Sequence, residues 1–158
     1  MSLFFLDASA AVKRYQSEPG SVWIEALTDP AAGHIIVLGE ITLAEVGAAL
    51  AAKHRVQGGI SREERDRALT LFLRHCDAEY ELVAVSRAGI DRAVSLTQNH
   101  RLRGYDAVQL ATALVVNEAL TGAGLSPLTF VTADDDLMTA ARAEGMAVEN
   151  PNLQEQIP

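Results

Sequence analysis

The sequence predicts an α/β protein, a three-layer α/β/α sandwich with a central parallel sheet of about five strands. Short apolar runs alternate along the chain with longer segments of helical periodicity, and this alternation favours parallel strands joined by crossover helices. The expected strands cover residues 3–6, 34–38, 82–85, 128–132 and 146–148. No internal repeat, linker or low-complexity tract interrupts the pattern, so residues 1–158 are expected to form a single domain.

The segments between these strands contain apolar residues three or four positions apart, which is the spacing of an amphipathic helix. Ser61 and Glu64 have the spacing of a capping box, and Ser86 is a second N-cap candidate. The expected helices cover residues 10–16, 21–27, about 42–54, a segment after Ser61, a segment from Ser86 to about 99, 105–120 and 134–144.

The composition favours a globular core but not a nucleic-acid-binding surface. Hydrophobic residues make up 49% of the chain, and 13 basic against 21 acidic residues give a net charge of 13 − 21 = −8. This balance argues against the broad basic surface that binds nucleic acid by counterion release. It does not exclude a nuclease, because divalent cations bound in an acidic cleft reverse the local charge. The acidic surplus also suits a basic protein partner.

The cysteine content and the hydropathy of the sequence indicate the cellular compartment in which the protein is expected. Cys76 is the only cysteine, so no disulfide can form within the chain, which fits a reducing environment. The apolar run at 3–6 is too short for a secretion signal, and no apolar run approaches membrane-spanning length. We therefore expect a cytoplasmic protein without membrane association.

Asp7 and Asp134 each follow an expected strand and precede an expected helix. Each carboxylate has an ordinary structural explanation, as a helix N-cap or as a first-turn acid that complements the helix dipole. Each is also a candidate site residue, because the carboxyl ends of parallel strands hold the chemistry in α/β sheets. The sequence around either residue alone leaves both interpretations open.

Glu45 and Asp106 interrupt apolar stripes of expected helices. Glu45 shares a helix face with Ile41 and Ala48, and Asp106 begins an otherwise mostly apolar stripe. A buried carboxylate without a partner is costly and normally needs a counter-charge or a metal. Two alternatives stay open. A competing apolar face that includes Val46 would leave Glu45 at a solvated edge, and Asp106 would serve as a first-turn helix acid.

Taken together, the four acids predict a metal site. If these elements pack in one sheet, four carboxylates meet at one edge. Two carboxylates about 4 Å apart repel by about 4 kcal/mol at an effective dielectric constant near 20, so four cannot stay ionised together without cations. Oxygen ligands suit Mg²⁺ or Mn²⁺, and such ions activate water and stabilise the oxygens of a phosphodiester during hydrolysis.

The sequence resembles the PIN-domain proteins, and more narrowly the VapC-type toxins of bacterial and archaeal toxin–antitoxin pairs. The resemblance spans nearly the whole chain in the family's order. The most specific block runs from Tyr105 to Ala113, with the letters YDAVQLATA. The other blocks are weaker alone and cover residues 6–15, 18–21, 41–46, 102–104 and 130–137.

By these motifs, the resemblance implies four catalytic, metal-binding acids: Asp7, Glu45, Asp106 and Asp134. Ser9 and Thr132 hold the family's small-hydroxyl positions, where they would orient a carboxylate or a metal-bound water. Asp136 is a supporting outer acid. The chain has Ala8 where many relatives have Thr, and Gly104 where Ala is common, and neither difference removes a ligand.

The resemblance also implies a homodimer that cleaves RNA, often tRNA or rRNA, with Mg²⁺ or Mn²⁺. A cognate antitoxin would inhibit it by inserting a C-terminal segment, whose Arg or Lys displaces or mimics the cation. Basic residues near the acids are candidates for binding RNA phosphates, with solvated surface charge as the alternative for each: Lys13, Arg14, Arg101 and Arg103. The four histidines lack metal-ligand spacing and are expected to be structural or surface residues.

Two other function classes compete with the ribonuclease. A phosphohydrolase that forms an aspartyl-phosphate on Asp7 would need a second aspartate at position 9, where this chain has Ser9. A non-catalytic module that binds a basic partner in an acidic groove would not need all four acids. A metal-dependent endoribonuclease therefore accounts best for the sequence.

Overall fold

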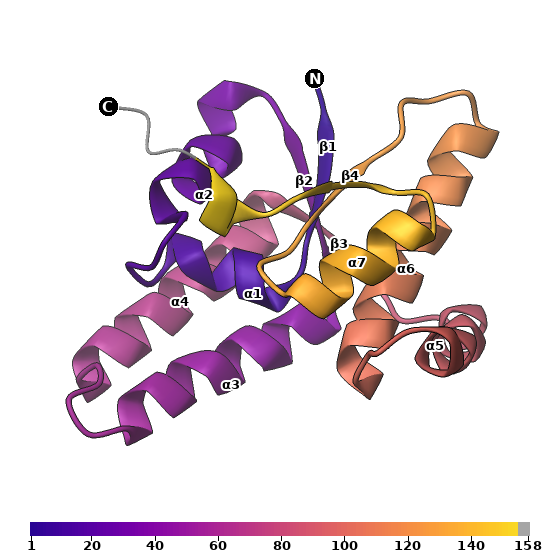
Figure 1. Cartoon of the computed structure of the whole chain (residues 1–158). Coiled ribbons are helices and arrows are strands. Elements are labelled where there is room, and N and C mark those ends of the chain that lie inside the picture. The colour runs from indigo at the N-terminus through magenta and orange to yellow at the C-terminus, as the bar shows by residue number, and fades with distance from the viewer. Residues whose placement is uncertain (155–158) are drawn as a thin grey trace.

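Five parallel strands form the centre of the computed structural model (Figure 1). The structure describes residues 1–154, and residues 155–158 of the expected domain lie outside the described residues. Hydrogen bonding places the strands in the order β3-β2-β1-β4-β5, which confirms the predicted sheet. The strands are β1 (Leu3–Leu6), β2 (Ile35–Gly39), β3 (Tyr80–Val83), β4 (Thr129–Val131) and β5 (Ala147–Glu149).

The helices follow the expected segments with small shifts at their ends. The capping box is present, with the Ser61 hydroxyl accepting from the Glu64 backbone N–H and the Ser61 N–H donating to the Glu64 carboxylate. Helix α1 begins earlier than expected, because Asp7 caps it, and η1 continues it. The helices are α1 (Ala8–Ala11), α2 (Ser21–Thr28), α3 (Ile41–Arg55), α4 (Arg62–Ala78), α5 (Arg87–Asn99), α6 (Gly104–Gly122) and α7 (Asp135–Ala143), with short 3-10 helices η1 (Val12–Arg14), η2 (Pro30–Ala32) and η3 (Pro151–Leu153).

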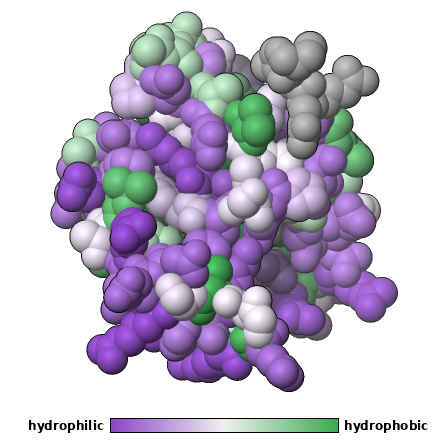
Figure 2. Space-filling view, turned by 90° about the vertical axis from the view of Figure 1, so that its left-hand side faces the viewer, coloured by the Kyte–Doolittle hydropathy of each residue, from purple (hydrophilic) through white to green (hydrophobic). Residues whose placement is uncertain are grey.

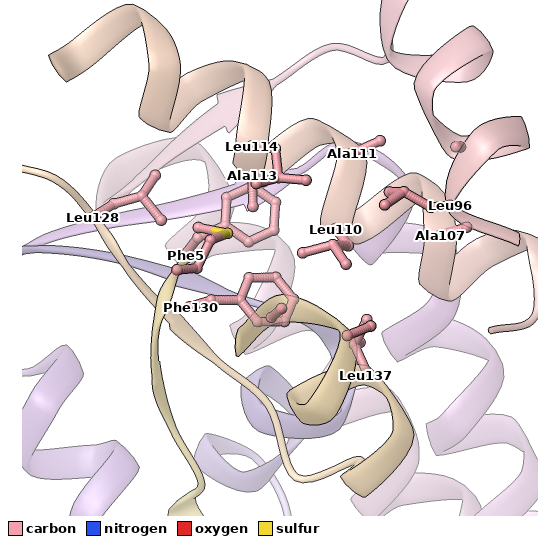
Figure 3. Close-up of a cluster of buried hydrophobic side chains, with 14 of the residues drawn as sticks. Phe5, Leu96, Ala107, Leu110, Ala111, Ala113, Leu114, Leu128, Phe130 and Leu137 are labelled. Atoms are coloured by element: carbon pink, nitrogen blue, oxygen red, sulfur yellow. The ribbon is translucent and has the colours of Figure 1, made fainter. Parts of the chain in front are cut away.

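Each face of the sheet is covered by its own set of helices, because successive strand side chains point to opposite faces. Phe5 and Phe130 point to the face covered by α5, α6 and α7, where their rings stack with centroids 5.7 Å apart (Figure 3). Leu6 and Val131, the next residues of the same strands, pack against α1, α2, α3 and α4 on the other face. This arrangement confirms the three-layer sandwich, and it explains why the inner strands β1 and β2 are apolar along their whole length.

The order of the strands creates a switch point beside β1. The chain adds β2 and then β3 on one side of β1, and returns to place β4 and β5 on the other side. The adjacent strands β1 and β4 pair Leu6 with Val131, so Asp7 and Thr132 leave the sheet side by side. A crevice at the carboxyl ends of strands at such a point is the usual binding position in α/β sheets.

The surface is mainly polar over the side that holds α2 and the α3–α4 turn. Figure 2 shows this side as mostly hydrophilic, with apolar residues scattered over it. Within residues 1–154, no helix combines the length and the apolar character that crossing a membrane requires.

Candidate active site

Asp7 is held rigidly where β1 passes into α1. Its side chain is almost fully buried, with the residue 4% exposed. Oδ1 accepts hydrogen bonds from the Ala10 backbone N–H at 3.0 Å and from the Ser9 hydroxyl at 2.7 Å, and Oδ2 accepts from the Thr132 hydroxyl at 2.7 Å. Asp7 is therefore the N-cap of α1, as its structural interpretation predicted, and the same bonds orient its carboxylate within the site.

Burial raises the pKa of Asp7 to about 6, because the charged form loses its hydration. Hydrogen bonds from Ser9, Thr132 and Ala10 favour the charged form and offset part of this effect, whereas the negative charge of Glu45 adds to it. Hydrogen bonds thus fix the position of the carboxylate, but they do not compensate for the cost of burying its negative charge.

Ser9 and Thr132 connect Asp7 to the end of β4. The Ser9 hydroxyl accepts from the Ala133 backbone N–H at 2.9 Å, and the Thr132 hydroxyl accepts from the Asp134 backbone N–H at 3.1 Å while donating to Asp7. Each hydroxyl therefore donates to Asp7 and accepts from a backbone N–H beyond β4. They fix the carboxylate of Asp7 relative to the backbone that bears Asp134.

Glu45 lies on α3 beside Gln109 of α6. Gln109 Nε2 donates to Glu45 Oε1 at 2.7 Å and to Thr42 Oγ1 at 2.7 Å. The predicted stripe of Ile41, Glu45 and Ala48 is wrong as the buried face: Ala48 is exposed, and the buried residues of α3 are Thr42, Val46 and Leu50. The competing face packs inward because it points toward α1, η1 and the sheet, and Glu45 is left half-buried at its edge.

Partial burial also raises the pKa of Glu45. The hydrogen bond from Gln109 lowers this pKa, and repulsion from the negative charge of Asp106 raises it further. The Gln109 carbonyl oxygen Oε1 is buried without a hydrogen-bond partner among the described residues. Gly39, at the end of β2, makes room for it, since a Cβ atom there would lie 3.3 Å from this oxygen.

A cleft of about 640 Å³ opens at the same end of the sheet. The first turns of α3, α6 and α7 lie at this end (Figure 1). Glu45, Asp106, Asp134 and Asp136 line it together with Tyr105, His100 and the residues that follow His100. The stripe that Asp106 begins is buried as predicted, with Leu110, Ala113 and Leu114 in the core. Asp134 caps α7 by accepting from the Leu137 backbone N–H at 2.8 Å.

The charges within the cleft repel one another. The pKa of Asp106 is raised, first by partial burial and then by the negative charges of Asp134 and Asp136, and nearby Arg103 offsets only part of this effect. Asp136 lies 3.6 Å from the exposed guanidinium of Arg101.

The predicted site acids, Asp7, Glu45, Asp106 and Asp134, are thus linked by successive repulsions. Asp7 feels the charge of Glu45, Glu45 that of Asp106, and Asp106 that of Asp134. Within residues 1–154, no three His, Cys, Asp or Glu side chains lie close enough to form a ready-made metal site. An all-oxygen donor set nevertheless fits Mg²⁺ or Mn²⁺, because Mg²⁺ keeps several waters and uses one or two carboxylates rather than a closed protein cage.

The four basic candidates separate into two pairs. Arg101 and Arg103 line the cleft. Lys13 is 5% exposed and pairs with Glu18 at 3.2 Å, so surface charge is a wrong interpretation for it. Arg14 pairs with Glu79 at 2.7 Å, and neither Lys13 nor Arg14 lines the cleft. The geometry therefore gives no support to these two residues as RNA ligands.

Sequence reasoning missed three residues of the site. Gln109 stands three positions after Asp106 as a buried polar residue in an apolar stretch, and that interruption was a usable signal. Tyr105 precedes Asp106 and lines the cleft. His100 also lines it, and its Nε2 lies 2.8 Å from Glu144, a pairing across 44 positions that no local pattern indicates.

Comparisons with known proteins agree with this fold. The family model for the PIN domain matches residues 4–143. The search of curated proteins found no significant match to the chain.

Several solved structures share the fold over nearly their full length. The chain is similar to FitAB bound to the IR36 DNA fragment, with a TM-score of 0.65, 16% identity, and 98% of this chain and 99% of that chain covered. It is similar to Rickettsia felis VapBC2 bound to a promoter DNA fragment, with a TM-score of 0.62, 16% identity, and 94% and 98% covered. It is also similar to Mycobacterium tuberculosis VapC20, a sarcin-ricin loop cleaving toxin, with a TM-score of 0.60, 12% identity, and 96% and 99% covered. At these identities the likeness shows the fold, and together with the family model, which spans most of the sequence, it shows that this chain belongs to the PIN domain family.

Proposed function

We propose that this protein is a metal-dependent endoribonuclease and the toxin of a toxin–antitoxin pair, with residues 1–158 acting as one nuclease domain. The observation that carries the proposal is the linked set of site acids at the switch point of the sheet, where burial and mutual repulsion are not balanced by cations of the protein. Membership of the PIN domain family and the likeness to VapC20, a toxin that cleaves the sarcin-ricin loop, support it.

Mg²⁺ or Mn²⁺ would be held by carboxylates of the site acids Asp7, Glu45, Asp106 and Asp134. A bound ion of this kind supplies an activated water and stabilises the charge that develops on the phosphate oxygens. The donor set suits such an ion, since each site acid offers oxygen and three of them have pKa values raised by burial and repulsion.

The remaining residues of the site keep the acids in place. Ser9 and Thr132 hold the carboxylate of Asp7 through hydroxyl donors, and Gln109 holds that of Glu45 through its amide. Such fixed groups reduce the rearrangement needed when substrate binds. Arg101 and Arg103, on the loop that borders the cleft, would bind RNA phosphates, with Asp136 as an outer acid beside Arg101.

The two competing functions have less support. Both oxygens of Asp7 already accept hydrogen bonds, which suits a fixed ligand better than a nucleophile that must attack phosphorus. A module that only binds a basic partner does not require a buried Asp7, which is not among the residues that line the cleft.

An acidic cleft also supports an antitoxin partner with a basic segment, and the net charge of −8 favours such a complex. FitAB and VapBC2, which share this fold, are both complexes bound to DNA fragments. We extend the proposal to a homodimer in the cytoplasm that cleaves tRNA or rRNA.

The decisive experiment is RNA cleavage by the purified protein with Mg²⁺, with Mn²⁺ and with EDTA. We expect cleavage with the ions, none with EDTA, and none by Asp7→Asn. Sequencing the 5′ ends of cellular RNA after induction of each protein would then identify the cut sites. Cleavage that persists in EDTA or in Asp7→Asn would contradict the proposed site.

A further inference from the structure

The chain contains three tyrosines, and the third has surroundings unlike the other two. The hydroxyls of Tyr15 and Tyr80 lie 2.7 Å apart, and the ring of Tyr15 packs edge-on against Phe72 with centroids 5.2 Å apart. Tyr105 is 67% exposed. Among the residues that the structure describes, it has neither a hydrogen bond nor an aromatic neighbour, so packing does not explain its ring.

Tyr105 stands at the border of the cleft on a rigid base. It is the second residue of α6, next to Asp106, and the following turns of this helix are buried in the core. The ring is therefore exposed without being attached to a mobile segment. An aromatic surface held at a fixed position beside the site acids is suited to binding a flat group.

The residues before Tyr105 present positive charge to the same cleft. Arg101 and Arg103 are exposed, as Tyr105 is, whereas Leu102 between them packs against the core. Arg103 has an extended backbone, with φ −74° and ψ 162°. The chain turns at Arg101, where the Leu102 N–H donates to the His100 carbonyl oxygen at 2.9 Å, and Arg101, Arg103 and Tyr105 all line the cleft, so its border carries two guanidinium groups and a ring.

We propose that Tyr105 is a stacking platform for a base of the RNA substrate, next to the phosphate that Arg103 or Arg101 contacts. This inference rests on the proposed function and adds a base-binding residue to it. A base can lie flat on the ring only if it is neither paired with another strand nor stacked between its neighbours. The platform therefore selects single-stranded RNA at the cleft.

Charge favours RNA over a protein segment as the occupant of this platform. A basic segment would be attracted by the cleft acids but repelled by Arg101 and Arg103 on either side of Leu102. An RNA strand brings phosphates for these arginines and bases for the ring. Arginines interleaved with an aromatic residue are the combination by which proteins bind single strands.

The test uses single-stranded RNA with 2-aminopurine at one position, moved along the strand, in EDTA and in the Asp7→Asn background. Stacking on Tyr105 should quench the fluorescence at one position. Tyr105→Ala should abolish that quenching and weaken binding about tenfold, whereas Tyr105→Phe and Tyr105→Trp should retain both. Val94→Ala, which changes an exposed residue of α5 outside the cleft, is the matched control.

Cleavage kinetics separate this inference from the proposed function. In the otherwise wild-type protein with Mg²⁺, Tyr105→Ala should raise KM about tenfold with little change in kcat, because stacking contributes binding. If the wild type cleaves RNA and Tyr105→Ala changes neither quenching, Kd nor KM, the platform is overturned, even if that variant loses a protein partner. If no RNA is cleaved but quenching depends on Tyr105, the nuclease proposal fails and the platform stands.

Discussion

Carboxylates at two places in this molecule have opposite electrostatic surroundings. Glu18 pairs with Lys13 and with Lys53, and although partial burial opposes ionisation, these two cations hold its pKa below the ordinary value. Asp7 and Asp106 have raised pKa values, because burial and neighbouring acids outweigh their hydrogen bonds and the charge of Arg103.

We interpret the difference as one between acids that stabilise the fold and acids that the proposed nuclease uses. Lys13 and Lys53 neutralise the charge of Glu18 within the protein, so this carboxylate needs no bound cation. The site acids keep a charge that the fold does not neutralise, and this costs free energy of folding unless an ion binds. Replacing a site acid should therefore reduce activity, whereas replacing Glu18 should reduce stability.

The largest expected effect is on activity. Asp106→Asn should slow RNA cleavage at least about hundredfold, since a carboxylate that positions a metal ion supports several kcal/mol of transition-state stabilisation. Initial rates on a defined RNA with Mg²⁺ would measure this loss. Glu118→Gln removes an exposed acid from the same helix and should retain the wild-type rate. An equal loss in both variants would mean that charge on α6, and not the site, matters.

Replacing Asp7 and replacing Glu18 should change the free energy of unfolding in opposite directions. The pKa of Asp7 rises from 3.8 to about 6 on folding, and each pH unit between these values corresponds to about 1.4 kcal/mol, so Asp7→Asn should stabilise the protein at pH 7 by up to about 3 kcal/mol. Glu18→Gln should destabilise it by about 3 kcal/mol, because Lys13 stays buried without its partner. Urea unfolding of both variants measures these changes, and shifts of the same sign would remove the distinction.

The same pKa predicts how stability depends on pH. Between pH 3.8 and about 6 the folded protein retains the proton of Asp7 and the unfolded chain releases it, so the free energy of unfolding falls as pH rises. This contribution should fall by about 2 kcal/mol between pH 4.5 and pH 7. Glu18 contributes with the opposite sign, since its lowered pKa gives stability that is lost on acidification.

Urea unfolding over this pH range, compared with Asp7→Asn, isolates the contribution of Asp7. The difference in free energy of unfolding between the two proteins should grow with pH and level off above about pH 7. A constant difference over the range would show that Asp7 does not titrate differently in the folded state.

The sequence was sufficient for the features that depend on neighbouring residues. The positions of the strands could be predicted from apolar runs, although β3 begins at Tyr80 and ends at Val83, two residues earlier than expected. Both Asp7 and Asp134 cap helices that follow strands. The Ser61 and Ser86 caps depend on spacings of three residues and were predictable for the same reason.

Features that depend on distant residues could not be derived in this way. The face of α3 that is buried depends on its packing against α1, η1 and the sheet, so the stripe containing Glu45 was predicted wrongly. Lys13 resembles a surface charge in the sequence and is buried because Glu18 meets it, with Lys53 adding a second ion pair to that carboxylate. The order of the strands, which brings Thr132 at the end of β4 beside Asp7, is likewise a property of the whole chain.

The smallest effect should come from the ion itself. A cation that binds the folded state alone stabilises it by about 1.4 kcal/mol at roughly ten times its Kd, which raises Tm by about 2–4 °C in a chain of this size. Addition of Mg²⁺ should therefore raise the Tm of the wild type at pH 7, and EDTA should reverse the change.

Asp7→Asn should respond less, because its larger intrinsic stability comes from removing the charge that the ion would balance. Glu18→Gln, though less stable, should show the full wild-type increase, since Lys13 and Lys53 rather than an ion neutralise that carboxylate. An Mg²⁺ response lost in Glu18→Gln but kept in Asp7→Asn would reverse the roles assigned to the two kinds of acid.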